Sequence, residues 1–241
     1  MMTRATKVTR APGRYAWIKW VFIIPVVLFI AVQLYFLAQI WWWRDHEPGM
    51  TAFMRQQLSV MQEKNPDAQI VQKWVPYERI STNLKRAIIA SEDANFSDHD
   101  GVDWEALEKA YERNEKRKKV THGGSTITQQ LAKNLFLSGS RSYLRKGQEL
   151  IIAYMLETVL DKRRIFEIYL NVVEFGRGVY GAEAAARHYY KVPASKLGAS
   201  QAARLAVMLP NPRYYDAHRN TRYLNRRTQI ILRRMGSAEL P

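Results

Sequence analysis

The sequence lacks the signatures of several common enzyme classes. None of its 241 residues is a cysteine, which excludes disulfide bonds and thiolate metal sites but identifies no compartment. It has no Ser-x-x-Lys, Gly-x-Ser-x-Gly or His-Glu-x-x-His motif, and no phosphate-binding loop ending in Gly-Lys-Ser/Thr. Acyl-enzyme, zinc-protease and kinase functions therefore have no support.

Acidic residues are few compared with basic ones. The net charge is +15, so nucleic acid, anionic lipid and phosphorylated substrates are all candidate partners. Residues 1–19 carry five basic side chains and no acidic one. When basic residues flank an apolar segment in this way, they indicate which side of a membrane the N-terminus lies on.

Charged residues are absent altogether from residues 20–43, a run of 24 residues. A helix of that length crosses the roughly 30 Å hydrocarbon core of a bilayer. Pro25 lies in its first turns, where membrane helices tolerate proline, and Trp41–Trp43 suit the far interface. The positive-inside rule then places the N-terminus in the cytoplasm and the rest of the chain outside.

A cleavable signal peptide is the alternative for this segment. Its apolar region is usually about 7–15 residues long and ends in small residues, whereas this one ends in three tryptophans. An uncleaved single-pass anchor is therefore favoured. Five of the +15 charges precede the anchor, which leaves +10 outside, where a membrane surface or phosphorylated lipid is the expected partner.

The remaining sequence predicts a mainly α-helical protein. We divide it into a cytoplasmic basic tail (1–19), a transmembrane helix (20–43), a juxtamembrane helix or linker (44–68) and one helical catalytic domain (69–241). Pro48-Gly49 breaks the chain before the juxtamembrane helix, and residues 70–75 give a weak strand pattern. Helical patterns cover residues 81–93, 103–117, 125–137, 141–160, 162–172, 181–191, 194–208 and 219–235.

Residues 91–101, SEDANFSDHDG, form the first candidate group. Glu92 shares the apolar stripe of Leu84 and Ile88 and lies at a helix C-terminus, where free carbonyls disfavour negative charge. Burial and this dipole should both raise its pKa, as a general base or acid near neutral pH requires. Asp93 points elsewhere and is expected to fix the turn. For His99, a hydrogen-bonded structural role is favoured over that of ligand or base.

Residues 123–137, GGSTITQQLAKNLFL, form the second group. Ser125 or Thr126 can cap a helix whose first free amides bind an anion. A helical wheel places Thr126, Gln130, Lys133 and Asn134 within an arc of about 100°. The pattern alone fits an ordinary amphipathic helix equally well. The charged run 112–119 before it is either a solvated helix end or a mobile loop beside a site.

The third group lies in residues 145–171. Arg145, Glu149, Ala153 and Glu157 recur every four residues, on one helix face. Surface ion pairing is the default interpretation of this spacing and contributes little. Together with Glu92, however, these residues supply the paired carboxylates that chemistry at a sugar's anomeric carbon uses.

These groups together resemble the glycosyltransferase domain of peptidoglycan synthases, glycosyltransferase family 51, and especially its single-domain members. The similarity covers roughly residues 70–215. It departs from the common pattern at Lys191, where many members have Gly, and at Gln201, where many have Glu. The five matching motifs are Glu92-Asp93…Phe96…His99…Gly101, residues 123–134, Arg145-Lys146…Glu149, Ile165…Glu167…Tyr169-Leu170-Asn171, and residues 175–190.

The resemblance implies a lysozyme-like helical fold on the outer face of the cytoplasmic (inner) membrane. The family polymerises lipid II into β-1,4-linked glycan strands, with the growing lipid-linked chain as donor. Carried over by motif position, Glu92 is the general base for the acceptor hydroxyl and Glu149 is the second carboxylate. With Ser-x-x-Lys absent, no transpeptidase activity is expected.

The resemblance also implies roles for the other motif residues. Substrate binding is expected from Ser125, Thr126, Gln130, Lys133, Asn134, Arg145 and Lys146, and structural roles from Asp93, Phe96, His99, Gly101, Glu167 and Asn171. No tightly bound cofactor is expected, although the family leaves room for a divalent cation, Mg²⁺ or Mn²⁺, near Glu149. The expected partners are lipid II, the growing glycan chain, the membrane and proteins of cell-wall synthesis or division, but not nucleic acid.

Two alternatives remain open at this point. A lysozyme-like hydrolase or lytic transglycosylase would cleave the same glycan with one acidic glutamate, but would not need the 123–134 helix or the anchor. A non-catalytic, membrane-anchored scaffold would bind cell-wall proteins and would not depend on Glu92.

Overall fold

The computed structural model describes residues 18–117, 124–137, 139 and 142–241. The chain divides into two units, Met1–Gln39 and Ile40–Pro241, and each is described by itself. Most of the predicted basic tail, Gly123 and the end of the charged run 112–119 lie outside the described residues.

Residues 18–39 of the first unit are helical throughout. They belong to helix α1 (Ile18–Trp42), whose last three residues fall in the second unit. Over Lys19–Trp42 this helix is long and apolar enough to cross a membrane, with a mean hydropathy of 2.6. The predicted apolar helix is confirmed, and Pro25 lies within it.

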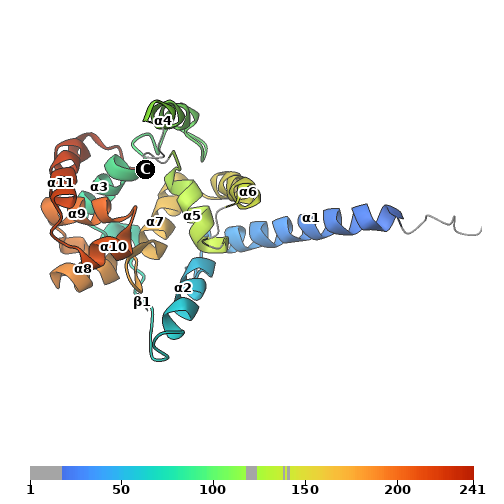
Figure 1. The fold of residues 1–241 in the computed structure, drawn as a ribbon, viewed down its shortest axis with the longest axis horizontal. Coiled ribbons are helices and arrows are strands. Elements are labelled where there is room, and N and C mark those ends of the chain that lie inside the picture. The colour runs from blue at the N-terminus through green and yellow to red at the C-terminus, as the bar shows by residue number, and fades with distance from the viewer. Residues whose placement is uncertain (1–17, 118–123, 138, 140–141) are drawn as a thin grey trace, which may run out of the picture. The chain divides into compact units, whose positions relative to one another are not determined.

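The second unit is mainly helical, as predicted, with three short strands (Figure 1). The strands form one sheet in the order β1-β3-β2, in which β1 is parallel and β2 antiparallel to β3. The α-helices are α2 (Ala52–Gln62), α3 (Thr82–Glu92), α4 (Trp104–Arg117), α5 (Ile127–Phe136), α6 (Tyr143–Val159), α7 (Lys162–Val172), α8 (Ala182–Tyr190), α9 (Ala199–Met208), α10 (Pro212–Ala217) and α11 (Arg222–Arg234). The strands are β1 (Val71–Gln72), β2 (Glu174–Gly176) and β3 (Val179–Tyr180), and 3₁₀ turns cover Tyr77–Arg79, Ala194–Lys196 and Met235–Ser237.

Side-chain caps fix the starts of the helices that matter for the site. Ser81 caps α3 by accepting the Asn83 N–H, and Thr126 caps α5 by accepting the Gln129 N–H, both at 3.2 Å. Asp103 accepts the Ala106 N–H at 2.8 Å at the start of α4. Such caps satisfy amides that have no partner within the helix. The predicted starts of these helices are therefore confirmed.

Besides the strands β2 and β3, which were not predicted, the structure differs from the prediction in three places. The predicted helix 194–208 is a 3₁₀ turn followed by α9, with Gly198 as the N-cap between them. Helix α10 was not predicted, and Pro212 occupies its first turn, where a proline is tolerated. The predicted strand 70–75 is only Val71–Gln72, since its partner β3 is equally short.

Helix α5 lies at the centre of the second unit. It packs against α2, α6 and α7, and α3 packs against α9, which in turn packs against α11 (Figure 1). The apolar face of α5, with Ile127, Leu131 and Leu135, is buried. Burying a side chain of this size stabilises a fold by about 1.5–3 kcal/mol. The packing therefore fixes which face of α5 remains for polar groups.

Candidate active site

Glu92 is the last residue of α3 and faces α5. Its Oε2 accepts a hydrogen bond from Gln130 Nε2 at 3.1 Å, and its Oε1 accepts one from Ser91 Oγ at 3.2 Å. Burial raises the pKa of Glu92, while these two hydrogen bonds oppose the shift. The predicted direction of the pKa shift is confirmed, and burial is its main cause.

Tyr169 completes a chain of hydrogen bonds to Glu92. This fully buried side chain on α7 donates from its hydroxyl to Gln130 Oε1 at 2.9 Å. Accepting that bond orients the carboxamide so that its amino group points at Glu92. The sequence placed Tyr169 within a motif but gave it no role. Its position beside Gln130 depends on the packing of α5 against α7.

The pH dependence of activity should report on this hydrogen-bonded chain. If Glu92 acts as a base, activity falls as the pH drops through its raised pKa, above the ordinary glutamate value of about 4.3. Gln130→Leu removes a bond that favours the carboxylate, so the acidic limb of the kcat/KM profile should move to higher pH. Tyr169→Phe keeps that bond and serves as the control, with a smaller shift. If the acidic limb does not move in Gln130→Leu, the group that titrates there is not Glu92.

Asp93 and His99 lie in the turn after α3 and contact each other. The buried Asp93 carboxylate accepts the Ile127 N–H at 2.9 Å and pairs with His99 Nε2 at 3.0 Å. Asp93 thus ties the end of α3 to the start of α5. Phe96 is fully buried, with its ring edge-on to that of His99.

Gly101 closes the same turn against α6. Its φ is +85°, and a Cβ there would lie 3.1 Å from Glu157 Cγ, so a larger residue is strained and crowded. Its carbonyl accepts a hydrogen bond from Thr126 Oγ1 at 2.6 Å. Thr126 is buried, so it acts as a cap and brace for α5. The expected contact of Thr126 with substrate stays a prediction.

Glu149 is buried and holds two cations. Its Oε2 pairs with Arg145 Nη1 at 2.5 Å and its Oε1 with Lys146 Nζ at 2.6 Å. Lys146 Nζ also reaches Ser125 Oγ at 3.2 Å and Gln129 Oε1 at 3.0 Å. Four predicted site residues therefore lie close together, between the first turns of α5 and α6: Ser125, Arg145, Lys146 and Glu149.

The surroundings of Glu149 do not fit a divalent cation. Both carboxylate oxygens already bind positive side chains. Within the described part of the chain, no group of three or more His, Cys, Asp or Glu side chains is placed to hold a metal ion. We therefore derive no step through a metal at this position.

Glu157, the other carboxylate on this face of α6, has a structural role. It accepts hydrogen bonds from Thr128 Oγ1 at 2.6 Å and Lys162 Nζ at 2.8 Å. Its side chain is 8% exposed, so this is a partly buried pair and not the surface pair that spacing suggests by default. It fixes α6 against α5 and α7.

Lys133 lies on the polar side of α5, at a cavity of about 400 Å³ that Gln130 and Asn134 also line. Its Nζ is 5.8 Å from the centre of the Phe53 ring. Among the described residues, it has no hydrogen-bond or ion-pair partner. Burial lowers the pKa of Lys133, and the Glu149 and Glu174 carboxylates oppose this shift. A cation of this kind favours an anionic ligand.

Two residues of the opposite wall of this cavity were not predicted. Glu174 on β2 binds Arg213 on α10 through two bonds of 2.8 Å, from Nε and Nη2. Glu174 is buried, which raises its pKa, while the guanidinium favours the ionised form. The one available signal was an acidic residue inside the apolar run Val172–Phe175. Its partner, 39 residues away, left no local pattern.

Glu167 and Asn171 make hydrogen bonds and an ion pair along α7. Asn171 is fully buried, and its side chain accepts the Val75 N–H at 2.9 Å and donates to the Val75 carbonyl at 3.0 Å. Glu167 pairs with Arg164 at 3.0 Å. Neither residue lines the cavity of Lys133.

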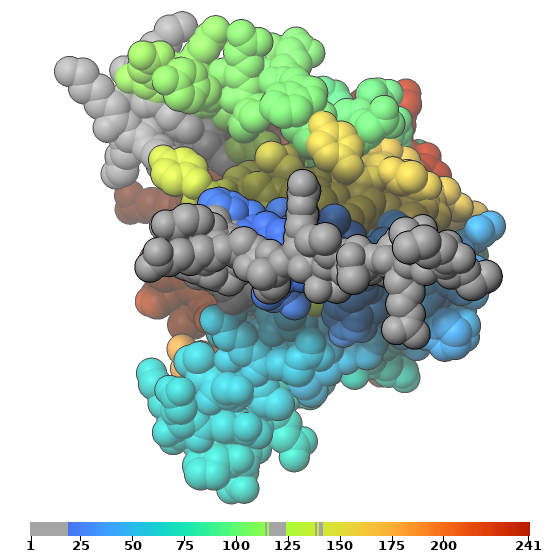
Figure 2. All heavy atoms as spheres, turned by 90° about the vertical axis from the view of Figure 1, so that its right-hand side faces the viewer, coloured from blue at the N-terminus to red at the C-terminus, as the bar shows by residue number. Residues whose placement is uncertain are grey.

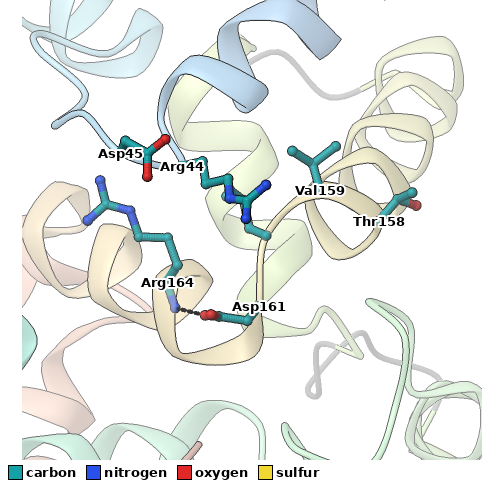
Figure 3. A pocket seen from close by; sticks show the side chains of 7 residues that line it. Arg44, Asp45, Thr158, Val159, Asp161 and Arg164 are labelled. Carbon is teal, nitrogen blue, oxygen red and sulfur yellow. Dashed lines mark hydrogen bonds between the residues drawn. The ribbon is translucent and has the colours of Figure 1, made fainter.

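Another cavity, of about 520 Å³, lies where α6 ends and α7 begins and holds none of the predicted site residues (Figure 3). Asp161 caps α7 there by accepting the Arg164 N–H at 2.7 Å. The Arg164 guanidinium donates to the carbonyls of Trp43 at 2.9 Å and His46 at 2.6 Å. These bonds fix residues 43–46 to α7, which is a structural role.

The fold and site define a class of enzyme. A mainly helical protein with an apolar N-terminal helix combines a carboxylate of raised pKa with a cavity lined by a lysine that has no ion-pair partner in the described part of the chain. Such a site suits transfer chemistry in which a hydroxyl is deprotonated and an anion leaves. The chain belongs to the Transglycosylase family, whose model matches residues 58–236.

Similar proteins agree with this assignment. The chain is 71% identical over 222 residues to the biosynthetic peptidoglycan transglycosylase of Janthinobacterium sp. (strain Marseille), covering 92% of this chain and 96% of the relative. It is 70% identical to that of Herminiimonas arsenicoxydans, with the same coverage. For the protein of the same name from Bordetella pertussis, identity is 59% over 91% of this chain and 93% of the relative. The resemblance predicted from the motifs is confirmed.

Proposed function

We propose that this protein polymerises lipid II into β-1,4-linked peptidoglycan strands by inverting glycosyl transfer, releasing undecaprenyl pyrophosphate. The observation that carries this proposal is the Glu92 carboxylate, with its raised pKa, joined through Gln130 to the helix face that presents Lys133. The family of the chain and the names of its relatives support the same activity.

Glu92 acts as the general base. It takes the proton from the acceptor's 4-hydroxyl as that oxygen attacks the anomeric carbon of the growing chain. The new C–O bond forms on the face opposite the pyrophosphate, whose bond to the anomeric carbon breaks with the electron pair. Gln130, held by Tyr169, keeps Glu92 oriented for this transfer. General base catalysis of this kind contributes about 10²–10⁴-fold.

Cations on α5 and α6 stabilise the leaving group. Lys133 neutralises donor phosphate, and Gln130 and Asn134 position sugar groups beside it in the same cavity. Arg145 and Lys146 face the pyrophosphate side, with Glu149 holding both in place. Ser125 and Thr126 shape the start of α5. Ser125 accepts a hydrogen bond from Lys146, and Thr126 caps the helix, whose first amide is already bonded to Asp93. Preorganised charges of this kind act without rearranging during the reaction.

The enzyme works at the outer surface of the cytoplasmic membrane, with its N-terminus inside. The basic, acid-free residues before α1 support this orientation. Atoms of α4, in green, lie at the surface in Figure 2. Both α4 and α6 expose apolar side chains, which supports a catalytic unit that contacts lipid. They are Trp104, Leu107, Tyr111, Tyr143, Leu144, Ile151 and Tyr154.

A polymerisation assay separates this function from glycan cleavage. The full-length protein in detergent should consume lipid II, and the glycan products should lengthen with time and stay uncross-linked. Lipid II provides a pyrophosphate for the cation of Lys133 to bind, whereas preformed strands provide none. If the protein shortens preformed strands and leaves lipid II untouched, it is a hydrolase or lytic transglycosylase.

A further inference from the structure

Another cavity, separate from the one beside Arg164 and called the second cavity below, adjoins the cavity of Lys133. It has a volume of about 380 Å³ and lies beside α2. Gln57 and Arg213 line both cavities, so a ligand in one can continue into the other. None of the residues assigned to catalysis above lines this second cavity.

Among the described residues, the charged side chains that line the second cavity have one sign. Among the described residues that line it, the ionisable ones are Lys64, Arg177 and Arg213, all cations. Arg213 is held in place by its two bonds to Glu174. Arg177 lies in the turn between β2 and β3, and its backbone N–H donates to Asp216 at 3.2 Å. Two of the three cations thus stand on segments fixed by hydrogen bonds, and together they favour an anion.

The rest of the lining suits a peptide better than a lipid phosphate. Gln57 and Asn65 offer carboxamides that can donate to and accept from peptide groups, and Val60 and Met61 offer apolar surface. The phosphate of the substrate is already matched by Lys133, on α5. A chain of amides that carries carboxylates and small apolar side chains matches all three features of this cavity.

We propose that the second cavity is a subsite for the peptide attached to the glycan, with Lys64, Arg177 and Arg213 binding its carboxylates. The inference rests on the proposed function and specifies how the enzyme distinguishes one form of its substrate from another. A substrate held at the first cavity extends past Arg213 and places its peptide beside α2.

The test compares two substrates with the full-length enzyme: lipid II with free peptide carboxylates, and lipid II in which all of them are amidated. The KM of the amidated form should be about three- to tenfold higher, as expected for two partly solvated ion pairs. Amidation leaves the pyrophosphate unchanged, so kcat should be similar for both. In the double variant Lys64→Gln/Arg177→Gln, the ratio of the two KM values should fall towards one, because only Arg213 remains to bind a carboxylate.

A matched control variant removes the same two positive charges from residues that do not line the second cavity. Lys196 and Arg226 are exposed and do not line the cavity, so Lys196→Gln/Arg226→Gln should retain the wild-type KM ratio. A wild-type ratio of one, or a ratio that persists in Lys64→Gln/Arg177→Gln, overturns the subsite. Absence of glycan product from both substrates refutes instead the proposed function on which the subsite rests.

Discussion

Replacing Glu92 with glutamine is expected to lower the rate of lipid II polymerisation by about 10²–10⁴-fold, the usual contribution of a general base. Glutamine has nearly the same shape and can still accept the hydrogen bond that Gln130 donates at 3.1 Å. It cannot take a proton from the acceptor hydroxyl. The measurement is the initial rate of glycan formation at saturating lipid II.

Two controls make the Glu92 result specific. Ser91→Ala removes the 3.2 Å bond to the carboxylate but leaves the base, so it should retain most of the activity. The melting temperature of Glu92→Gln should be no lower than that of the wild type, because the substitution removes a charge that burial disfavours. A variant that keeps more than a tenth of the wild-type rate would show that Glu92 is not the base.

Lys133→Ala should lower kcat/KM for the lipid-linked donor by about 10²-fold, the scale of losing one preorganised charge at a leaving group. Lys133 lies at the cavity with no partner among the described residues, so its loss leaves the donor phosphate without that cation. Lys133→Arg restores the charge and should lose less. Steady-state kinetics at varied donor concentration measures both.

The exposed Lys191, which lies outside the cavity, offers a matched comparison. Lys191→Ala should leave kcat/KM near the wild-type value. Small and equal effects of Lys133→Ala and Lys133→Arg would reduce Lys133 to an ordinary solvated lysine and leave the phosphate site unassigned.

Local sequence signals predicted most helices because caps and apolar spacing act over a few residues. Ser81 and Thr126 cap α3 and α5 as expected, and Leu131 and Leu135 mark the buried side of α5. The pair β2–β3 and helix α10 were missed. The strands are only two or three residues long, and α10 packs against β2 from nearly 40 positions further along the chain.

The same distinction holds within the site. The raised pKa of Glu92 was predicted from the position of Glu92 on the apolar stripe of α3. Asp93 points away from that stripe, which suggested that it fixes the turn. The bond between Tyr169 and Gln130, and the ion pair between Glu174 and Arg213, join residues 39 positions apart. A helical wheel describes one helix at a time, so such partners appear only once the helices are packed.

The most direct test of the central claim counts two products of one reaction. With labelled lipid II, full-length wild-type protein should release one undecaprenyl pyrophosphate for each new β-1,4 linkage, while Glu92→Gln should produce almost none of either. Carrier release without new linkages, or linkages formed by Glu92→Gln at the wild-type rate, would contradict glycan polymerisation with Glu92 as its base.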